Sequence, residues 1–199
     1  MAQTATKRSV GRPREFDEEA ALEAAMDAFW EKGFEATSMA DLCTCTGLHK
    51  GSLYQAFGDK HALFMRSLHH YADTEFKESA AVALQQETPL ESIRALVRTV
   101  CSHLSEGKGC LMINSMVELA PHDPEVKKLL ASEGQKRIHV VTELLTRAQQ
   151  MGEIRAELLP ERLAQQLMIG LAGSAAMGKG LIPPGQVQEV LDDMISHWT

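Results

Sequence analysis

The chain shows one repeating pattern, in which apolar residues recur three or four positions apart. This spacing places apolar side chains on one face of an α-helix, whereas strict alternation is typical of a half-buried strand. No stretch of the sequence alternates in that way. In residues 17–33 the helical spacing is carried by Leu22, Ala25, Met26, Phe29 and Trp30. The sequence therefore predicts an all-α fold.

Residues that favour helix ends mark the boundaries of the predicted helices. Asp17 can cap the first helix and Gly33 can end it, while Ser38 followed by Asp41 is similar to a capping box. Pro89 stands where proline is favoured, at the first position of a helix. The predicted helices cover about residues 17–33, 38–47, 49–57, 59–81, 88–104, 110–119, 123–150, 160–171 and 185–198.

The short helices at 38–47 and 49–57 are joined by a turn at Gly47 and flanked by a third helix. This arrangement is used to place one helix in the major groove of DNA. Leu53 and Phe57 lie four positions apart, so both are expected to face the core. The opposite side and flank then carry a glycine, a hydroxyl, an amide and a phenol, from Gly51, Ser52, Gln55 and Tyr54. Such groups suit contacts with phosphates and base edges.

Charge is unevenly distributed along the 199 residues. The formal net charge of −7 argues against a protein that binds polyanions over its whole surface. Yet Lys7, Arg8, Arg12 and Arg14 give the amino end four positive charges with no acid. We therefore predict a basic flexible arm over residues 1–14, ahead of the helical part.

Composition and motifs narrow the class of protein. Apolar residues make up 44% of the chain, as in a globular protein, and no apolar run approaches the ~18 residues of a membrane span. No secretory signal is recognisable, so we expect a soluble cytoplasmic protein whose Cys43, Cys45, Cys101 and Cys110 are reduced thiols. No zinc pattern, Glu-x-x-His pair, nucleophile elbow or P-loop occurs. We therefore predict no catalytic residue, no metal and no cofactor.

Over residues 15–75 the chain resembles the DNA-binding domain of the TetR/AcrR family of transcriptional regulators, in the stretch FWEKGFEATSMADLCTCTGLHKGSLYQAFGDKHALF. The matching positions are Phe29, Gly33, Phe34, Thr37, Ser38, Leu42, Gly47, Lys50, Gly51, Ser52, Leu53, Tyr54, Phe57, Lys60 and Leu63. The resemblance implies a helix-turn-helix domain over 15–75 and a helical effector-binding and dimerisation domain over 76–199. It also implies a homodimeric repressor that a small-molecule effector releases from double-stranded operator DNA.

The resemblance assigns DNA contacts to one set of residues. They are Arg12, Arg14, Thr37, Ser38, His49, Lys50, Gly51, Ser52, Tyr54, Gln55 and Lys60. Within this set we expect Gln55 to read a base while Lys50, Tyr54 and Lys60 hold phosphates. His49 departs from the Ser or Pro usual there, so a weaker helix cap or a phosphate contact is expected. Arg12 and Arg14 resemble a minor-groove arm, with a disordered basic tail as the alternative.

Two further sets follow for the rest of the chain. The predicted dimer interface consists of Leu167, Leu171, Val187, Leu191, Met194, Ile195 and Trp198. The predicted effector site includes Cys110, Met112 and Met116, for which plain core packing is the alternative. Cys110 follows two glycines and a lysine at a helix start, which favours a reactive thiolate and a redox or electrophile sensor. A helical-bundle small-molecule binding protein or enzyme remains the alternative class.

Overall fold

The computed structural model describes residues 16–104, 107–177 and 179–199. In these residues the backbone forms nine α-helices and no strand, which confirms the predicted all-α class. The helices are α1 (Glu18–Lys32), α2 (Met39–Thr46), α3 (Lys50–Phe57), α4 (Lys60–Ala83), α5 (Pro89–Leu104), α6 (Leu111–Glu118), α7 (Pro124–Gln150), α8 (Pro160–Met177) and α9 (Pro184–Ser196). None of the described helices combines the length and the apolar character that crossing a membrane requires.

The predicted capping residues act as expected at the amino end. The Asp17 carboxylate accepts the backbone N–H groups of Glu19 and Ala20 at 3.0 and 3.2 Å. Ser38 and Asp41 form a complete capping box at the start of α2. Gly33 ends α1 with φ +84°, a conformation that side chains other than glycine rarely adopt.

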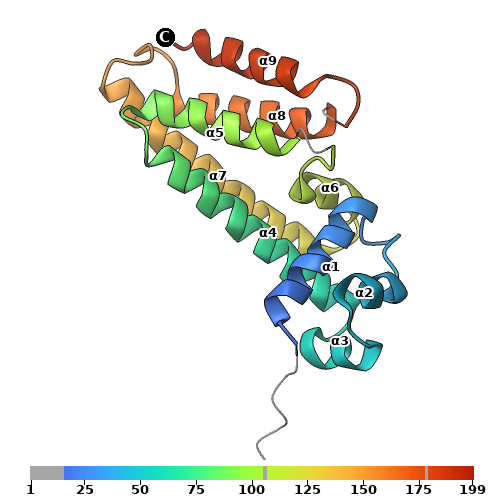
Figure 1. Cartoon of the computed structure of the whole chain (residues 1–199). Coiled ribbons are helices and arrows are strands. Elements are labelled where there is room, and N and C mark those ends of the chain that lie inside the picture. The colour runs from blue at the N-terminus through green and yellow to red at the C-terminus, as the bar shows by residue number, and fades with distance from the viewer. Residues whose placement is uncertain (1–15, 105–106, 178) are drawn as a thin grey trace, which may run out of the picture.

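The helices form two groups, which the long helices α4 and α7 connect (Figure 1). Helices α1, α2 and α3 lie at one end, whereas α5, α8 and α9 lie at the other. Helices α4 and α7 run along the molecule between these ends, and α6 lies beside α1. This arrangement places α3 at the surface of one end of the molecule.

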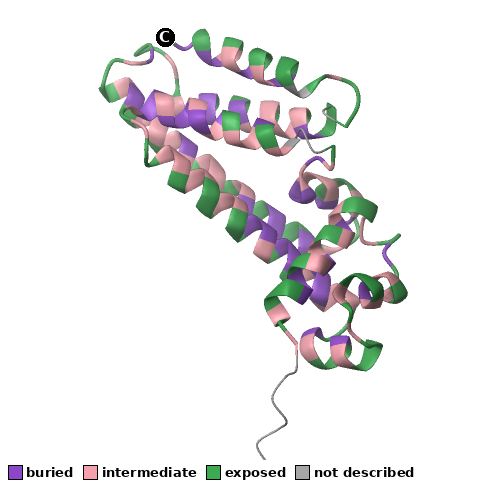
Figure 2. Cartoon of the chain, in the orientation of Figure 1, coloured by how far each residue is buried: buried purple, intermediate pink, exposed green. Residues whose placement is uncertain are grey.

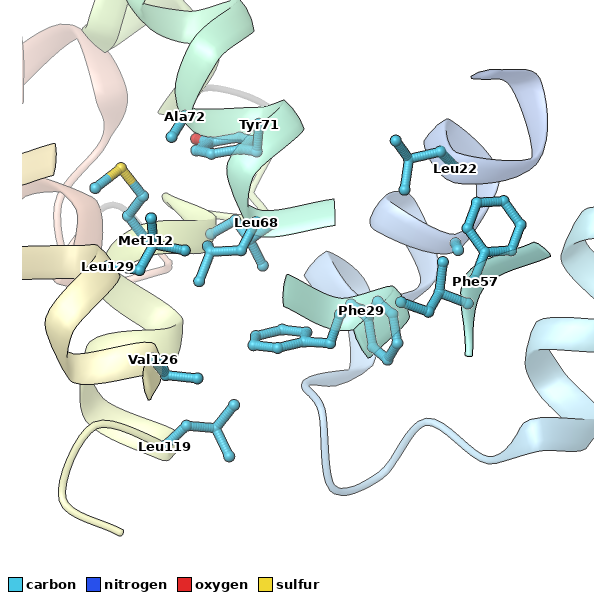
Figure 3. Close-up of a cluster of buried hydrophobic side chains, with 14 of the residues drawn as sticks. Leu22, Phe29, Phe57, Leu68, Tyr71, Ala72, Met112, Leu119, Val126 and Leu129 are labelled. Atoms are coloured by element: carbon cyan, nitrogen blue, oxygen red, sulfur yellow. The ribbon is translucent and has the colours of Figure 1, made fainter. Parts of the chain in front are cut away.

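Buried residues are coloured purple on the ribbon of Figure 2, and their hydrophobic side chains form two clusters. The first cluster joins α1–α4 to α6 and the start of α7, as Figure 3 shows for Leu119, Val126 and Leu129 opposite Phe29. The second cluster joins α5 and the second half of α7 to α8 and α9. The predicted domain boundary near residue 75 falls inside the continuous helix α4, and the first cluster extends across it.

Candidate nucleic-acid interface and cavity

Helix α3 presents a polar face at the end of the molecule. Leu53 and Phe57 are buried, as their spacing predicts, in the cluster that also holds side chains of α1, α2 and α4. Gly51 and Gln55 are exposed on the other side, and 43% of Tyr54 is accessible. No aliphatic side chain interrupts this outer face, so backbone, amide and phenol groups are open to a ligand.

Two lysines begin the neighbouring helices, Lys50 as the first residue of α3 and Lys60 as the first residue of α4. The ammonium of Lys50 lies 5.8 Å from the centre of the Tyr54 ring. Lys60 donates a hydrogen bond to the backbone oxygen of Glu35 at 3.4 Å, and its ammonium lies 4.4 Å from the centre of the Phe34 ring. All three are weak contacts at the surface, which an anion can replace at little cost.

The residues just before α2 and α3 take three different positions. Ser38 is exposed, although its hydroxyl is engaged in the capping box. His49 is exposed at the start of α3 and makes no side-chain cap hydrogen bond, in agreement with the weak cap expected there. Thr37 has no exposed surface, and its hydroxyl donates to the Gly33 oxygen at 2.6 Å. Thr37 is therefore a core residue, and the expectation that it contacts DNA is corrected.

Two of the predicted DNA contacts have no described position. Arg12 and Arg14 lie outside the described residues, which begin at residue 16.

A cavity of about 480 Å³ lies between α4, α5, α6, α7 and α8. Its walls include all three residues predicted for the effector site, Cys110, Met112 and Met116. Cys110 stands just before α6 and makes no side-chain cap hydrogen bond. Tyr71 is buried beside it, and burial together with the neighbouring Cys110 thiol raises the pKa of the phenol. The cavity thus combines apolar walls with a few polar groups, as small-molecule sites do.

Charged side chains lie on one part of the cavity wall, and the sequence did not reveal them. Glu75 from α4 faces His103 from α5, with Oε1 3.2 Å from Nδ1. Burial raises the pKa of the Glu75 carboxyl, and the neighbouring imidazole opposes this effect. Arg137 from α7 also lines the cavity. No local motif signals these residues, because the helices that carry them are far apart in sequence.

A carboxylate connects the cavity wall to the turn between α1 and α2. Glu118, the last residue of α6, accepts the backbone N–H groups of Phe34 at 3.1 Å and Glu35 at 2.9 Å. A Cβ atom at Gly33 would lie 2.9 Å from both carboxylate oxygens, so glycine permits this approach. The Trp30 indole donates a second bond across the same boundary, to the Gly109 oxygen at 3.2 Å. Helix α6 therefore touches both the cavity and the α1–α3 unit.

The residues predicted for a dimer interface pack inside the single chain. Five of them are almost fully buried in the second cluster, namely Leu167, Val187, Leu191, Ile195 and Trp198. Leu171 and Met194 are partly buried against the same cluster. The outward faces of α8 and α9 carry other apolar side chains, Ile169 (73% exposed) and Val190 (64% exposed).

Comparisons with known proteins agree over both parts of the chain. A family model described as bacterial regulatory proteins, tetR family, matches residues 21–66. A second model, described as a tetracyclin repressor-like C-terminal domain, matches residues 89–194. The HTH-type transcriptional repressor ComR of Escherichia coli is 34% identical, over 88% of this chain and 87% of that protein. The HTH-type transcriptional regulator YezE of Bacillus subtilis, itself uncharacterized, is 32% identical over 74% of this chain and 78% of its own.

A solved structure shows a similar arrangement of helices. It contains a cysteine mutant of the TetR-family transcriptional regulator CifR, complexed with 26-bp double-strand operator DNA. The TM-score is 0.84 at 28% identity, and the match covers 95% of this chain and 100% of that one.

Proposed function

This chain belongs to the tetR family of bacterial regulatory proteins, and we propose from that premise that it is a homodimeric repressor which binds double-stranded operator DNA through α3. A small-molecule effector in the cavity releases it. The observation that carries the proposal is the position of α6, which lines the cavity and holds the α1–α2 turn through Glu118. Occupation of the cavity can therefore move the unit that presents α3.

On the polar face of α3, some residues are proposed to read bases and others to bind phosphates. The B-DNA major groove admits one α-helix, and a glutamine amide can pair with an adenine edge. Gln55 is exposed on this face and takes the base-reading role. Lys50, Tyr54 and Lys60 hold phosphates, which position the protein without reading sequence. Backbone and side-chain contacts from Ser38, His49, Gly51 and Ser52 complete the surface, with Arg12 and Arg14 reaching the minor groove.

Two copies are needed to place two α3 helices in successive major grooves, about 34 Å apart. The outer faces of α8 and α9 suit this role, because Ile169 and Val190 remain largely exposed in the single chain. Gly173 on α8 has open space where a Cβ would stand, so a partner helix can approach closely there. We therefore place the dimer contact on these outer faces.

DNA binding is tested with the duplex upstream of the protein's own gene, by fluorescence anisotropy against an unrelated duplex. Gln55→Ala should relax specificity at one base pair per half-site, by about 1–3 kcal/mol, and leave non-specific binding unchanged. Gln85→Ala is the matched control, since Gln85 is exposed in the turn after α4. Equal loss of specific and non-specific binding in Gln55→Ala would remove its base-reading role, and no binding to any duplex would refute the proposal.

A second mode of release is favoured by the position of Cys110 on the cavity wall. A Cys110 thiolate can add to an electrophile, forming a carbon–sulfur bond while the adduct takes a proton from water. Lys108 gives less help than expected, because its ammonium lies 3.5 Å from Asp27. If this mode operates, Cys110→Ser binds DNA normally but ignores the electrophile, whereas Cys101→Ser, at a buried core position, responds like the wild type. An unaltered response of Cys110→Ser leaves reversible binding as the mode of release.

A further inference from the structure

The charge on the cavity wall indicates which kind of effector it takes. Apolar side chains form most of the wall, among them Phe76, Leu96, Val100, Ile138, Val141 and Leu171. The charged side chains of the described wall are Glu75, His103 and Arg137. A charged ligand would therefore have to match the state of these three groups.

Arg137 is already engaged with other protein groups. One guanidinium nitrogen donates to the backbone oxygen and to Oε2 of Glu133 at 3.2 and 3.3 Å, and the other donates to the Ala72 oxygen at 3.0 Å. Glu133 is buried and is also held by Lys136 at 2.6 Å. Drawing Arg137 away would leave a buried carboxylate with one cation fewer, which is costly. The wall thus offers no ready cation to an anionic ligand.

Glu75, unlike Arg137, is not held by several protein groups in the described residues. Its nearest described partner is the His103 imidazole, which also lies 3.9 Å from Glu78. Two carboxylates, those of Glu75 and Glu78, therefore share one imidazole ring as their neighbour. The raised pKa of the Glu75 carboxyl agrees with a carboxylate that burial disfavours. A cation brought by a ligand would restore its stability.

The surroundings of Glu75 are acidic beyond the cavity itself. A second hollow, of about 220 Å³, lies on the α1 side of Tyr71 and Glu75 and is lined by Glu23, Asp27, Glu75 and Glu78. The basic groups near these acids are His70, 3.9 Å from Glu23, Lys108, 3.5 Å from Asp27, and His103, beside Glu75 and Glu78, while the Arg137 charge also acts on Glu75. Four carboxylates thus outnumber the lysine and the arginine, and this excess of negative charge attracts cations.

We infer that the effector is an apolar organic cation, whose ammonium group pairs with Glu75 while its hydrocarbon body fills the cavity. The inference rests on the proposed function, because it names the effector class of that same site. A volume near 480 Å³ lies in the range of sites for drug-sized molecules, about 300–1,000 Å³. The aromatic rings of Tyr71 and Phe76 also line the wall and favour a cation.

A metal ion is the competing occupant. Glu75, Glu78 and His103 each offer one ligand atom within 4.8 Å of the others. Glu78, however, is more than half exposed and does not line the cavity. A metal ion at these residues would also leave the apolar volume unfilled. An organic cation uses both the charge and the cavity.

The test compares three probes with one hydrocarbon body: phenylbutylammonium, phenylbutanol and phenylbutyrate. Binding to the full-length protein is measured by calorimetry, and by the fluorescence of Trp30, whose ring lies 5.0 Å from the Tyr71 ring. We expect the amine to bind about tenfold or more tightly than the alcohol, a charge-pair effect of at least 1.4 kcal/mol, with the carboxylate weakest. Glu75→Gln should abolish the preference and Glu75→Asp should keep it. Glu87→Gln, at an exposed turn outside the cavity, is the control.

Five results would overturn the inference. Four are equal binding of amine and alcohol, tightest binding of the carboxylate, a preference that survives Glu75→Gln, and no binding of any probe. The fifth is tighter binding of zinc chloride alone than of the amine, which would assign the site to a metal. Release from DNA is followed separately by anisotropy. If the amine binds through Glu75 yet leaves the DNA complex intact, the cation site stands and the proposed mode of regulation fails.

Discussion

Glu118 offers the sharpest test of communication between the cavity and α3. Its carboxylate accepts two backbone N–H groups, from Phe34 at 3.1 Å and Glu35 at 2.9 Å. In Glu118→Gln the side chain keeps one oxygen acceptor, and its NH2 group turns a donor toward the second N–H. The substitution therefore removes the charge from one hydrogen bond and breaks the other.

The size of the effect follows from these two bonds. A hydrogen bond to a charged group contributes about 1.5–3 kcal/mol, so the loss of one bond corresponds to about 10- to 150-fold in an opening equilibrium. We expect the amides of Phe34 and Glu35 to exchange with solvent faster by that factor in Glu118→Gln. We also expect effector-induced release of DNA to weaken by about tenfold, within the 1–3 kcal/mol typical of coupling between sites.

Hydrogen exchange followed by NMR measures both amides in one experiment. Glu125→Gln is the control, because Glu125 is an exposed acid in the first turn of α7. Protection of Phe34 and Glu35 that is unchanged in Glu118→Gln would refute the structural link. Faster exchange with unaltered release of DNA would show that the link exists but carries no signal.

Three further outcomes are expected. Lys60→Ala should weaken binding to all duplexes alike. The slope of the logarithm of the binding constant against the logarithm of salt concentration, measured by anisotropy, should fall by about 0.9 for each phosphate that the lysine neutralises. A sequence-dependent effect would contradict its phosphate role. Val190→Glu should give monomers in sedimentation with normal thermal stability, whereas Leu191→Glu should unfold the chain; a dimeric Val190→Glu would exclude the outer α9 face. Burial opposes ionisation of Glu133, but bonds from its two cationic neighbours outweigh it and lower the pKa of the carboxyl. Its contribution to stability should therefore be present above about pH 4.3 and be lost as pH falls, and urea titrations of Glu133→Gln should show a shallower acid dependence.

Features fixed by neighbours in sequence were predictable. The caps at Asp17 and Ser38 and the glycine that ends α1 depend on groups a few residues away. The outward face of α3 followed from two apolar residues one turn apart. Thr37 was misplaced because a hydroxyl beside a helix start can face either DNA or, as here, the Gly33 oxygen in the core.

Features set by distant contacts were not predictable. The apolar stripe of α9 was visible in the sequence, but periodicity does not say which surface covers the stripe. In the structure this stripe packs on α5 and α8 of the same chain. The Leu191 side chain lies against Gly170, 2.9 Å from where a Cβ atom would stand. Glu118 and Phe34 are 84 residues apart, and an acid at a helix end gives no signal of such a partner.

The first buried cluster limits how this protein can be recombined with its relatives. Its side chains come mostly from α1–α4, but others come from α6 and the start of α7, so α1–α3 cannot complete this core without those later helices (Figure 3). A chimera spliced within α4 would pair a foreign α6 with these helices and leave mismatched volumes around Phe29, Leu68 and Leu119. Such cores tolerate altered total volume poorly. Exchange of the DNA-reading end between regulators therefore requires that α6 and the first turns of α7 be exchanged with it.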